Sequence, residues 1–192
     1  MTQKLYCYVD ESGQHTGGLH FIVGVVTVQN EAHNDLLQTV ADIEAETHKR
    51  KKWGKTQEAV NLAYMRLVLA QPEFKRRLHF GFFRDVEMTR QADLGMKAEV
   101  VAAIARTFDA ARITVFLDGD QKRPAEVIGA MLKAMGVNVE KVRTIRREET
   151  NAFARLADAI CGLTRDAQTE GEARGVFNQA RRRKILIDTR EA

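Results

Sequence analysis

Apolar, β-branched and aromatic residues dominate two stretches near the start of the chain. Residues 4–9, KLYCYV, and residues 19–28, LHFIVGVVTV, have the composition that favours β-strands. Between them stand Gly13, Gly17 and Gly18, which allow the backbone to turn. The pattern therefore predicts a β-hairpin.

Beyond residue 30 the apolar spacing becomes helical and later alternates between helix and strand. Helical spacing covers residues 31–49 and 60–68, on either side of a basic segment, HKRKKWGK, at 48–55. Further along, the pattern predicts strands at 78–83, 113–118 and 137–145, and helices at 101–108, 124–136 and 149–166, followed by an arginine-rich helical tail. The strand at 113–118, ITVFLD, is nearly continuously apolar, which is typical of a strand covered on both faces.

This order of elements predicts a mixed β-sheet with helices on both faces. A ribonuclease H-like fold has the same order, with the helices at 31–70 as an insertion after the second strand. We therefore expect an α/β protein in which residues 1–192 form a single ribonuclease H-like domain. Fold alone does not define the chemistry.

Composition narrows the class of protein and of partner. The net charge of +4 suits an anionic partner such as nucleic acid. Cys7 and Cys161 have no metal-ligand spacing and indicate no disulfide framework, so we expect two buried thiols. The longest apolar run is too short to span a bilayer and no apolar signal segment is present, so a cytoplasmic location is expected. A homodimer is left open.

Two aspartates follow the apolar parts of predicted strands. Asp10 closes the first strand, and Asp118 closes the strand at 113–118. If these strands run parallel and adjacent, about 4.8 Å apart, the two carboxylates come within reach of each other. Such a pair either takes up a proton or binds a hard divalent cation. The alternative is that each aspartate only caps a local turn.

A third acid lies on the helix predicted at 149–166. Asp158 lies beside the apolar stripe of this helix, on a flank of mostly small residues that would allow close approach to the sheet. By angle alone it could equally face water. Glu149, near the predicted helix start, suits either the helix dipole or a metal ion.

Three sequence blocks resemble those of the domain-of-unknown-function family DUF3800. They are YVDESG at 8–13, VFLDGD at 115–120 and FARLADAICG at 153–162. The resemblance spans the chain and implies a ribonuclease H-like fold, with Asp10, Asp118 and Asp158 as metal-binding acids. It also places Glu11 and Ser12 beside them as accessory groups.

The chain departs from the family pattern at two positions. Arg155 stands where the last block usually has glutamine, and Arg50 stands where an acid often precedes the Lys-Trp segment. A fourth acidic ligand is therefore open, and the candidates are Glu149, Glu58 and Glu99.

The basic segment at 48–55 is the predicted contact with a nucleic-acid backbone. Lys52 and Lys55 would meet phosphates and Trp53 would stack on a base, together with Arg146 from the segment RTIRR. The alternative is a solvated helix end whose tryptophan packs on the core.

These acids and cations together predict a divalent-metal-dependent nuclease acting on DNA or RNA. Two Mg²⁺ or Mn²⁺ ions roughly 4 Å apart would clamp the scissile phosphate. Asp10 would bridge the ions, Asp118 and Asp158 would complete one ion each, and Glu149 would help to position water. The alternatives are a non-catalytic nucleic-acid or partner-binding module and an ATP-dependent phosphotransferase. The chain is short for a phosphotransferase and has no phosphate-binding loop motif.

Overall fold

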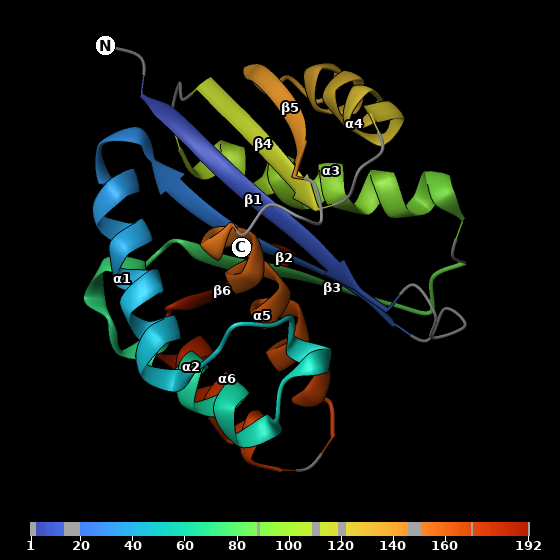
Figure 1. Cartoon of the computed structure of the whole chain (residues 1–192). Helices are drawn as coiled ribbons and strands as arrows, with labels where there is room; N and C mark the ends of the chain where they lie inside the picture. The colour runs from blue at the N-terminus through green and yellow to red at the C-terminus, as the bar shows by residue number, and fades with distance from the viewer. Residues whose placement is uncertain are drawn as a thin grey trace.

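The computed structural model describes residues 3–13, 20–87, 89–108, 112–118, 122–145, 151–169 and 171–191 (Figure 1). Its strands are β1 (Lys4–Ser12), β2 (His20–Gln29), β3 (Leu78–Arg84), β4 (Arg112–Asp118), β5 (Val139–Ile145) and β6 (Leu186–Asp188). Its α-helices are α1 (His33–Thr47), α2 (Glu58–Ala70), α3 (Arg90–Thr107), α4 (Lys122–Ala134), α5 (Ala152–Asp166) and α6 (Glu172–Arg182). Short 3-10 turns lie at Asn30–Ala32, Trp53–Lys55 and Pro72–Phe74. None of these helices is long and apolar enough to cross a membrane.

The six strands form one mixed sheet in the order β5-β4-β1-β2-β3-β6. The predicted hairpin is present, because β1 and β2 pair antiparallel, as do β2 and β3. β4 pairs parallel to β1, and β5 parallel to β4. The α/β mixed sheet predicted from the sequence is therefore confirmed.

Helices cover both faces of the sheet and bury two hydrophobic clusters. On one face α1, α2, α5 and α6 pack against Tyr8, Val26 and Phe80. On the other face α3 and α4 pack against Cys7, Val25 and Val115. Every residue of β2 between Phe21 and Val28 is buried, as expected of a strand covered on both sides.

Two predicted boundaries were wrong. β1 does not end at Asp10 but continues to Ser12 in its pairing with β2, because only the ladder with β4 stops at Val9. The tail is not helical throughout, since β6 follows α6 and pairs parallel to β3. A three-residue strand is too short for alternation of apolar and polar residues to reveal it, since that pattern needs about four residues or more.

The segment at 48–57, between α1 and α2, is held in place by buried groups. Lys49 is fully buried and its ammonium donates to the Lys51 carbonyl. Asn61 of α2 donates to the carbonyls of Trp53 and Thr56. Trp53, only 4% exposed, lies against Gly162 of α5, where an added Cβ would come within 2.2 Å of the indole ring. The insertion is thus anchored on the core.

An ion pair ties α1 to α5 beside this segment. Arg155 donates to both carboxylate oxygens of Glu44, from Nε at 2.7 Å and from Nη2 at 2.5 Å. A two-point arginine–carboxylate contact of this kind fixes geometry as well as charge. The arginine that departs from the DUF3800 pattern therefore has a local partner on α1.

The contact between Trp53 and Gly162 yields a stability test. Gly162→Ala should lower the free energy of unfolding by about 1–3 kcal/mol, because the new methyl group overlaps the buried indole. Gly175→Ala, in α6 with open space around it, is the matched control and should be neutral or stabilising by up to about 1 kcal/mol. Urea denaturation measures both. Equal midpoints for the two variants would show that the indole does not pack tightly on α5.

Candidate active site

Asp10 and Asp118 lie side by side at the edge of the sheet where the parallel pairing of the inner strands β1 and β4 ends. The parallel ladder between β1 and β4 ends at Val9 opposite Leu117, so the next residue of each strand is an aspartate. Both carboxylates lie on the α5 face of the sheet, since Val9 and Leu117 belong to the opposite cluster. Asp10 is buried at 6% exposure and Asp118 is partly exposed.

Asp158 reaches this edge because α5 packs very close to the sheet. Gly24 of β2 is the partner of Asp10 across the hairpin, and an added Cβ there would lie 2.6 Å from the Ala157 carbonyl. One turn further along α5, the Cys161 thiol donates to the Asp10 carbonyl at 3.3 Å. The glycine thus permits α5 to cross directly over Asp10.

The segment at 48–57 supplies donors to two of the three acids. The Lys52 ammonium forms an ion pair with Oδ2 of Asp118. The backbone N–H of Trp53 donates to Oδ2 of Asp158 at 2.6 Å. Asp10 Oδ1 accepts from the Glu11 N–H at 2.9 Å. Each of these bonds uses one oxygen of its carboxylate.

The electrostatics show that the three acids act on one another. Burial raises the pKa of Asp10 well above its usual range, and the charges of Glu11, Asp158 and Asp118 add to the rise, while Lys52 opposes it. Burial also raises the pKa of Asp158, against the Trp53 hydrogen bond and two lysines. Burial alone would lower the pKa of Lys52, but Asp10, Asp118 and Asp158 together raise it. The ammonium is the counter-ion of the cluster.

The donor chemistry fits a divalent cation, but the cluster as it stands is arranged around the lysine. Carboxylate oxygens are the ligands that Mg²⁺ and Mn²⁺ prefer. Burial, and after it the neighbouring carboxylates, raise the pKa of Asp10, and a bound cation would offset both effects. Within the described ranges, no three His, Cys, Asp or Glu side chains are already placed to hold a metal ion. A cation at Oδ2 of Asp118 would have to displace the Lys52 ammonium.

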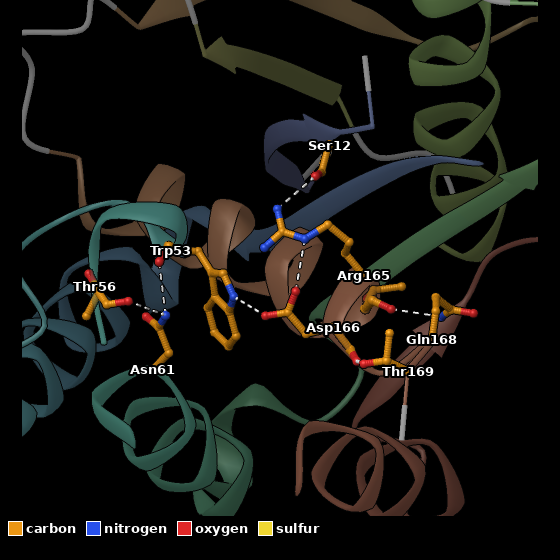
Figure 2. Close-up of polar contacts among 9 residues, drawn as sticks. Ser12, Trp53, Thr56, Asn61, Arg165, Asp166, Gln168 and Thr169 are labelled. Carbon is orange, nitrogen blue, oxygen red and sulfur yellow. Dashed lines mark hydrogen bonds and ion pairs between the residues drawn. The ribbon is translucent and has the colours of Figure 1, made fainter. Parts of the chain in front are cut away.

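The accessory residues Glu11 and Ser12 have different surroundings. Glu11 points to the opposite face of β1, where the buried Lys97 ammonium of α3 binds it at 3.0 Å and binds Asp93 at 2.9 Å. Ser12 lies on the Asp10 face and accepts from Arg165 of α5 at 3.5 Å (Figure 2).

The structure divides the predicted nucleic-acid contacts. Lys55 is exposed, but Trp53 is buried and its Nε1 donates to Asp166 at 2.6 Å (Figure 2). The indole ring packs in the core, as the alternative interpretation of a solvated helix end predicted. A ring this deeply buried is not available to stack on a base. Arg146 and Glu149 lie outside the described residues.

The two other candidates for a fourth acidic ligand lie elsewhere. Glu58 is exposed at the start of α2, and Glu99 is exposed on α3, which covers the opposite face. Neither is among the charges that act most on Asp10. Glu11 is the neighbouring charge that raises the pKa of Asp10 most, ahead of Asp158 and Asp118.

The sequence analysis missed the residues that pack against the acidic residues or pair with them. Gly24 carried a signal, since a glycine inside the apolar run FIVGVV indicates a close approach of another backbone. Lys97 follows Asp93 by four residues on α3, a spacing that favours an ion pair. Nothing in the sequence indicated that Lys52 would pair with Asp118, because 66 positions separate them.

Comparison with known proteins was made for sequence and for structure. No protein-family model and no curated protein matches the sequence, so membership of DUF3800 stays a prediction. The ribonuclease H2 from Pyrococcus horikoshii OT3 matches with a TM-score of 0.53 at 14% identity, over 94% of this chain and 77% of that chain.

Two further solved structures agree with this match. A chain of the PCNA:RNase HII complex from Archaeoglobus fulgidus gives a TM-score of 0.51 at 13% identity, over 94% of this chain and 78% of that chain. Bst-RNase HIII in complex with Mn²⁺ gives 0.52 at 11% identity, over 87% of this chain and 56% of that chain, so this chain spans about half of its length. The protein has a ribonuclease H-like fold, as predicted.

The raised pKa of Asp10 predicts that its charge costs stability when no cation is bound. A carboxyl whose pKa is higher in the folded than in the unfolded state destabilises the fold as pH rises from about 4 through the folded value. Asp10→Asn keeps the oxygen that accepts from Glu11 and should raise Tm at pH 7 in EDTA by at least about 2–4 °C, with the gain vanishing near pH 4.

The control is Asp35→Asn, because Asp35 is exposed on α1 and should give no rise in Tm. Thermal unfolding followed by circular dichroism measures both variants. A fall in Tm for Asp10→Asn at pH 7 would mean that Lys52 over-compensates the charge of Asp10.

Proposed function

We propose that the protein is a nuclease that hydrolyses phosphodiester bonds of DNA or RNA and depends on a divalent cation, Mg²⁺ or Mn²⁺. The observation that carries the proposal is the meeting of Asp10 and Asp118 where the parallel ladder between β1 and β4 ends, with Asp158 of α5 close enough to raise the pKa of Asp10. Open α/β sheets bind their ligands at this edge.

The solved structures give the proposal independent support. All three neighbours are ribonucleases by name, and one of them is a complex with Mn²⁺. At 11–14% identity this likeness establishes the fold, and the activity enters by analogy.

Asp10, Asp118 and Asp158 are the residues that would hold the cation. When bound, a divalent cation would supply Lewis-acid polarisation of the phosphate and a lower pKa for the attacking water. The Trp53 N–H holds one oxygen of Asp158 and so orients that carboxylate. Asp10 is almost fully buried, so little solvent reaches it.

Basic residues around the acids would hold the phosphate backbone. Once displaced from Asp118, the Lys52 ammonium lies within reach of a phosphate oxygen at the same edge. Arg165, which also pairs with Asp166, lies beside Ser12, and Lys55 is exposed three residues after Lys52. Arg146 and Glu149 keep their proposed roles in phosphate binding and in positioning water.

The second candidate function is a non-catalytic nucleic-acid-binding module of the same fold. One observation favours it: the Lys52 ammonium forms an ion pair with Asp118 and so neutralises that carboxylate. In such a protein the acids would be permanently paired, and nucleic-acid binding would be sensitive to salt but not to divalent cations.

Cleavage assays test the nuclease proposal directly. With Mn²⁺ or Mg²⁺ the purified protein should cut at least one of single-stranded DNA, duplex DNA, RNA or an RNA–DNA hybrid. Asp10→Asn and Asp118→Asn should each reduce the rate by at least about 100-fold, since each removes a cation ligand. The Asp35→Asn control should cut at the wild-type rate. Inactivity of the wild-type protein on all four substrates would refute the proposal.

Metal binding separates the two candidate functions. Lys52→Met keeps the length of the side chain but removes the competing ammonium, so it should tighten Mn²⁺ binding by about 2- to 5-fold, as expected for a half-exposed ion pair. Isothermal titration calorimetry measures the affinity, with Lys55→Met as the matched control. If neither the wild type nor Lys52→Met binds Mn²⁺, the result contradicts the nuclease function and supports the non-catalytic binding module.

A further inference from the structure

Residues that are in register across β1, β4 and β5 form rows of side chains, here called rungs, and successive rungs on one face lead toward the acids. Tyr8 of β1 is in register with Phe116 of β4, which is in register with Arg143 of β5. Two residues further along each strand, on the same face and just beyond the last pair of the ladder, are Asp10 and Asp118. Successive rungs on one face are about 6.6 Å apart, because they are two residues apart along a strand.

The rung behind Tyr8 repeats the pattern. Tyr6 is in register with Thr114, and Thr114 with Lys141 of β5. The aromatic side chains of Tyr6, Tyr8 and Phe116 therefore lie beside two basic residues of the edge strand β5, Lys141 and Arg143. In Figure 1, α5 covers the sheet over β1, β2 and β3, while β4 and β5 extend beyond it.

A small cavity opens over these rungs. It has a volume of about 290 Å³ and is lined by the rings of Tyr6, Tyr8, His33 and Phe116 together with Lys4, Thr114, Glu140, Lys141 and Arg143. Ligand pockets start at about 300 Å³, so the room suits one planar ring system of the size of a nucleobase.

The rings in the cavity are held rigidly. Tyr8 and Phe116 stack with centroids 4.8 Å apart and planes 10° apart, and Tyr6 meets His33 edge to face at 5.5 Å. The Tyr6 hydroxyl donates to Asn30, and the Tyr8 hydroxyl bonds the His33 ring at 3.0 Å. Phe116 and Tyr6 remain partly exposed, so they offer ring surface to a ligand.

The charge at the rim is complementary to phosphate. Lys141 and Arg143 are exposed on the edge strand. Glu140, the acid at the rim, forms an ion pair with Lys4 at 3.1 Å and so leaves the balance positive. Rings that stack on bases next to cations that follow a backbone are the combination by which proteins bind single strands.

We propose that this cavity is a subsite for a single-stranded nucleic acid, with a base on Phe116 and Tyr6 and the flanking phosphates at Lys141 and Arg143. The choice of nucleic acid rests on the proposed function. The subsite lies one rung from Asp10 and Asp118, so a strand held there delivers a neighbouring phosphate to the acids. Single strands of DNA and of RNA share this chemistry.

Equilibrium binding tests the subsite without any need for cleavage. Fluorescence anisotropy of labelled single-stranded DNA and RNA of about ten nucleotides, in EDTA, gives the affinity. Phe116→Leu keeps apolar volume but removes the ring and should weaken binding by about 5- to 100-fold. Arg143→Gln should weaken binding and reduce the slope of log affinity against log salt by about one. Arg106→Gln, exposed on α3 at the opposite face, is the charge-matched control and should bind as the wild type does.

The outcomes separate the subsite from the activity. If the protein cleaves with Mn²⁺ but Phe116→Leu and Arg143→Gln bind like the wild type, the subsite is refuted and the nuclease function stands. If both variants weaken binding while the wild type cleaves nothing, the subsite stands and the nuclease function falls. Binding of a proline-rich peptide through Phe116, with no binding of either oligonucleotide, would overturn the inference, because such peptides also dock on aromatic grooves.

Discussion

Negative charge concentrated at one edge of the sheet is the constraint on which the structure depends. Asp10 is buried there beside Asp118 and Asp158, and each of these carboxylates makes the ionised form of Asp10 more costly. The Lys52 ammonium is the cation that meets this cluster, and its own pKa rises in response. The buried Lys49 ammonium also opposes the charge of Asp158, so two ammonium groups face three carboxylates. The arrangement therefore favours either protonation of Asp10 or the arrival of a more highly charged cation, and this preference links the fold to the proposed metal-dependent function.

Several contacts around the acids maintain that arrangement. Gly24 lets α5 pass close enough to bring Asp158 to the sheet. The helical insertion covers one face of the sheet and also contributes to the site. The segment between its two helices carries Lys52, which pairs with Asp118, and the Trp53 N–H, which donates to Asp158. Lys49 is buried at the base of that segment, and the Glu44–Arg155 pair joins α1 to α5 beside it. Movement of the insertion would thus change the charge balance at the acids.

Much of this architecture was predictable from the sequence, because it depends on local periodicity. The hairpin, the helix-strand alternation and the position of Asp118 at a strand end follow from apolar spacing and were found. The juxtaposition of Asp10 and Asp118 was predicted on the condition that their strands are parallel neighbours, and β1 and β4 meet that condition. The Lys52–Asp118 pair and the strand β6 were not predictable, since each depends on tertiary packing between distant segments. The burial of Trp53 agrees with the alternative interpretation of the basic segment. Single-sequence periodicity carries no information on such contacts.

A crystal structure of the protein soaked in Mn²⁺, analysed by anomalous scattering, tests the central claim most directly. The account predicts at least one manganese peak bonded to Asp10 and Asp118, with the Lys52 side chain moved away from Asp118. A structure without a manganese peak at this edge, in which Lys52 still binds Asp118 at saturating Mn²⁺, would contradict it.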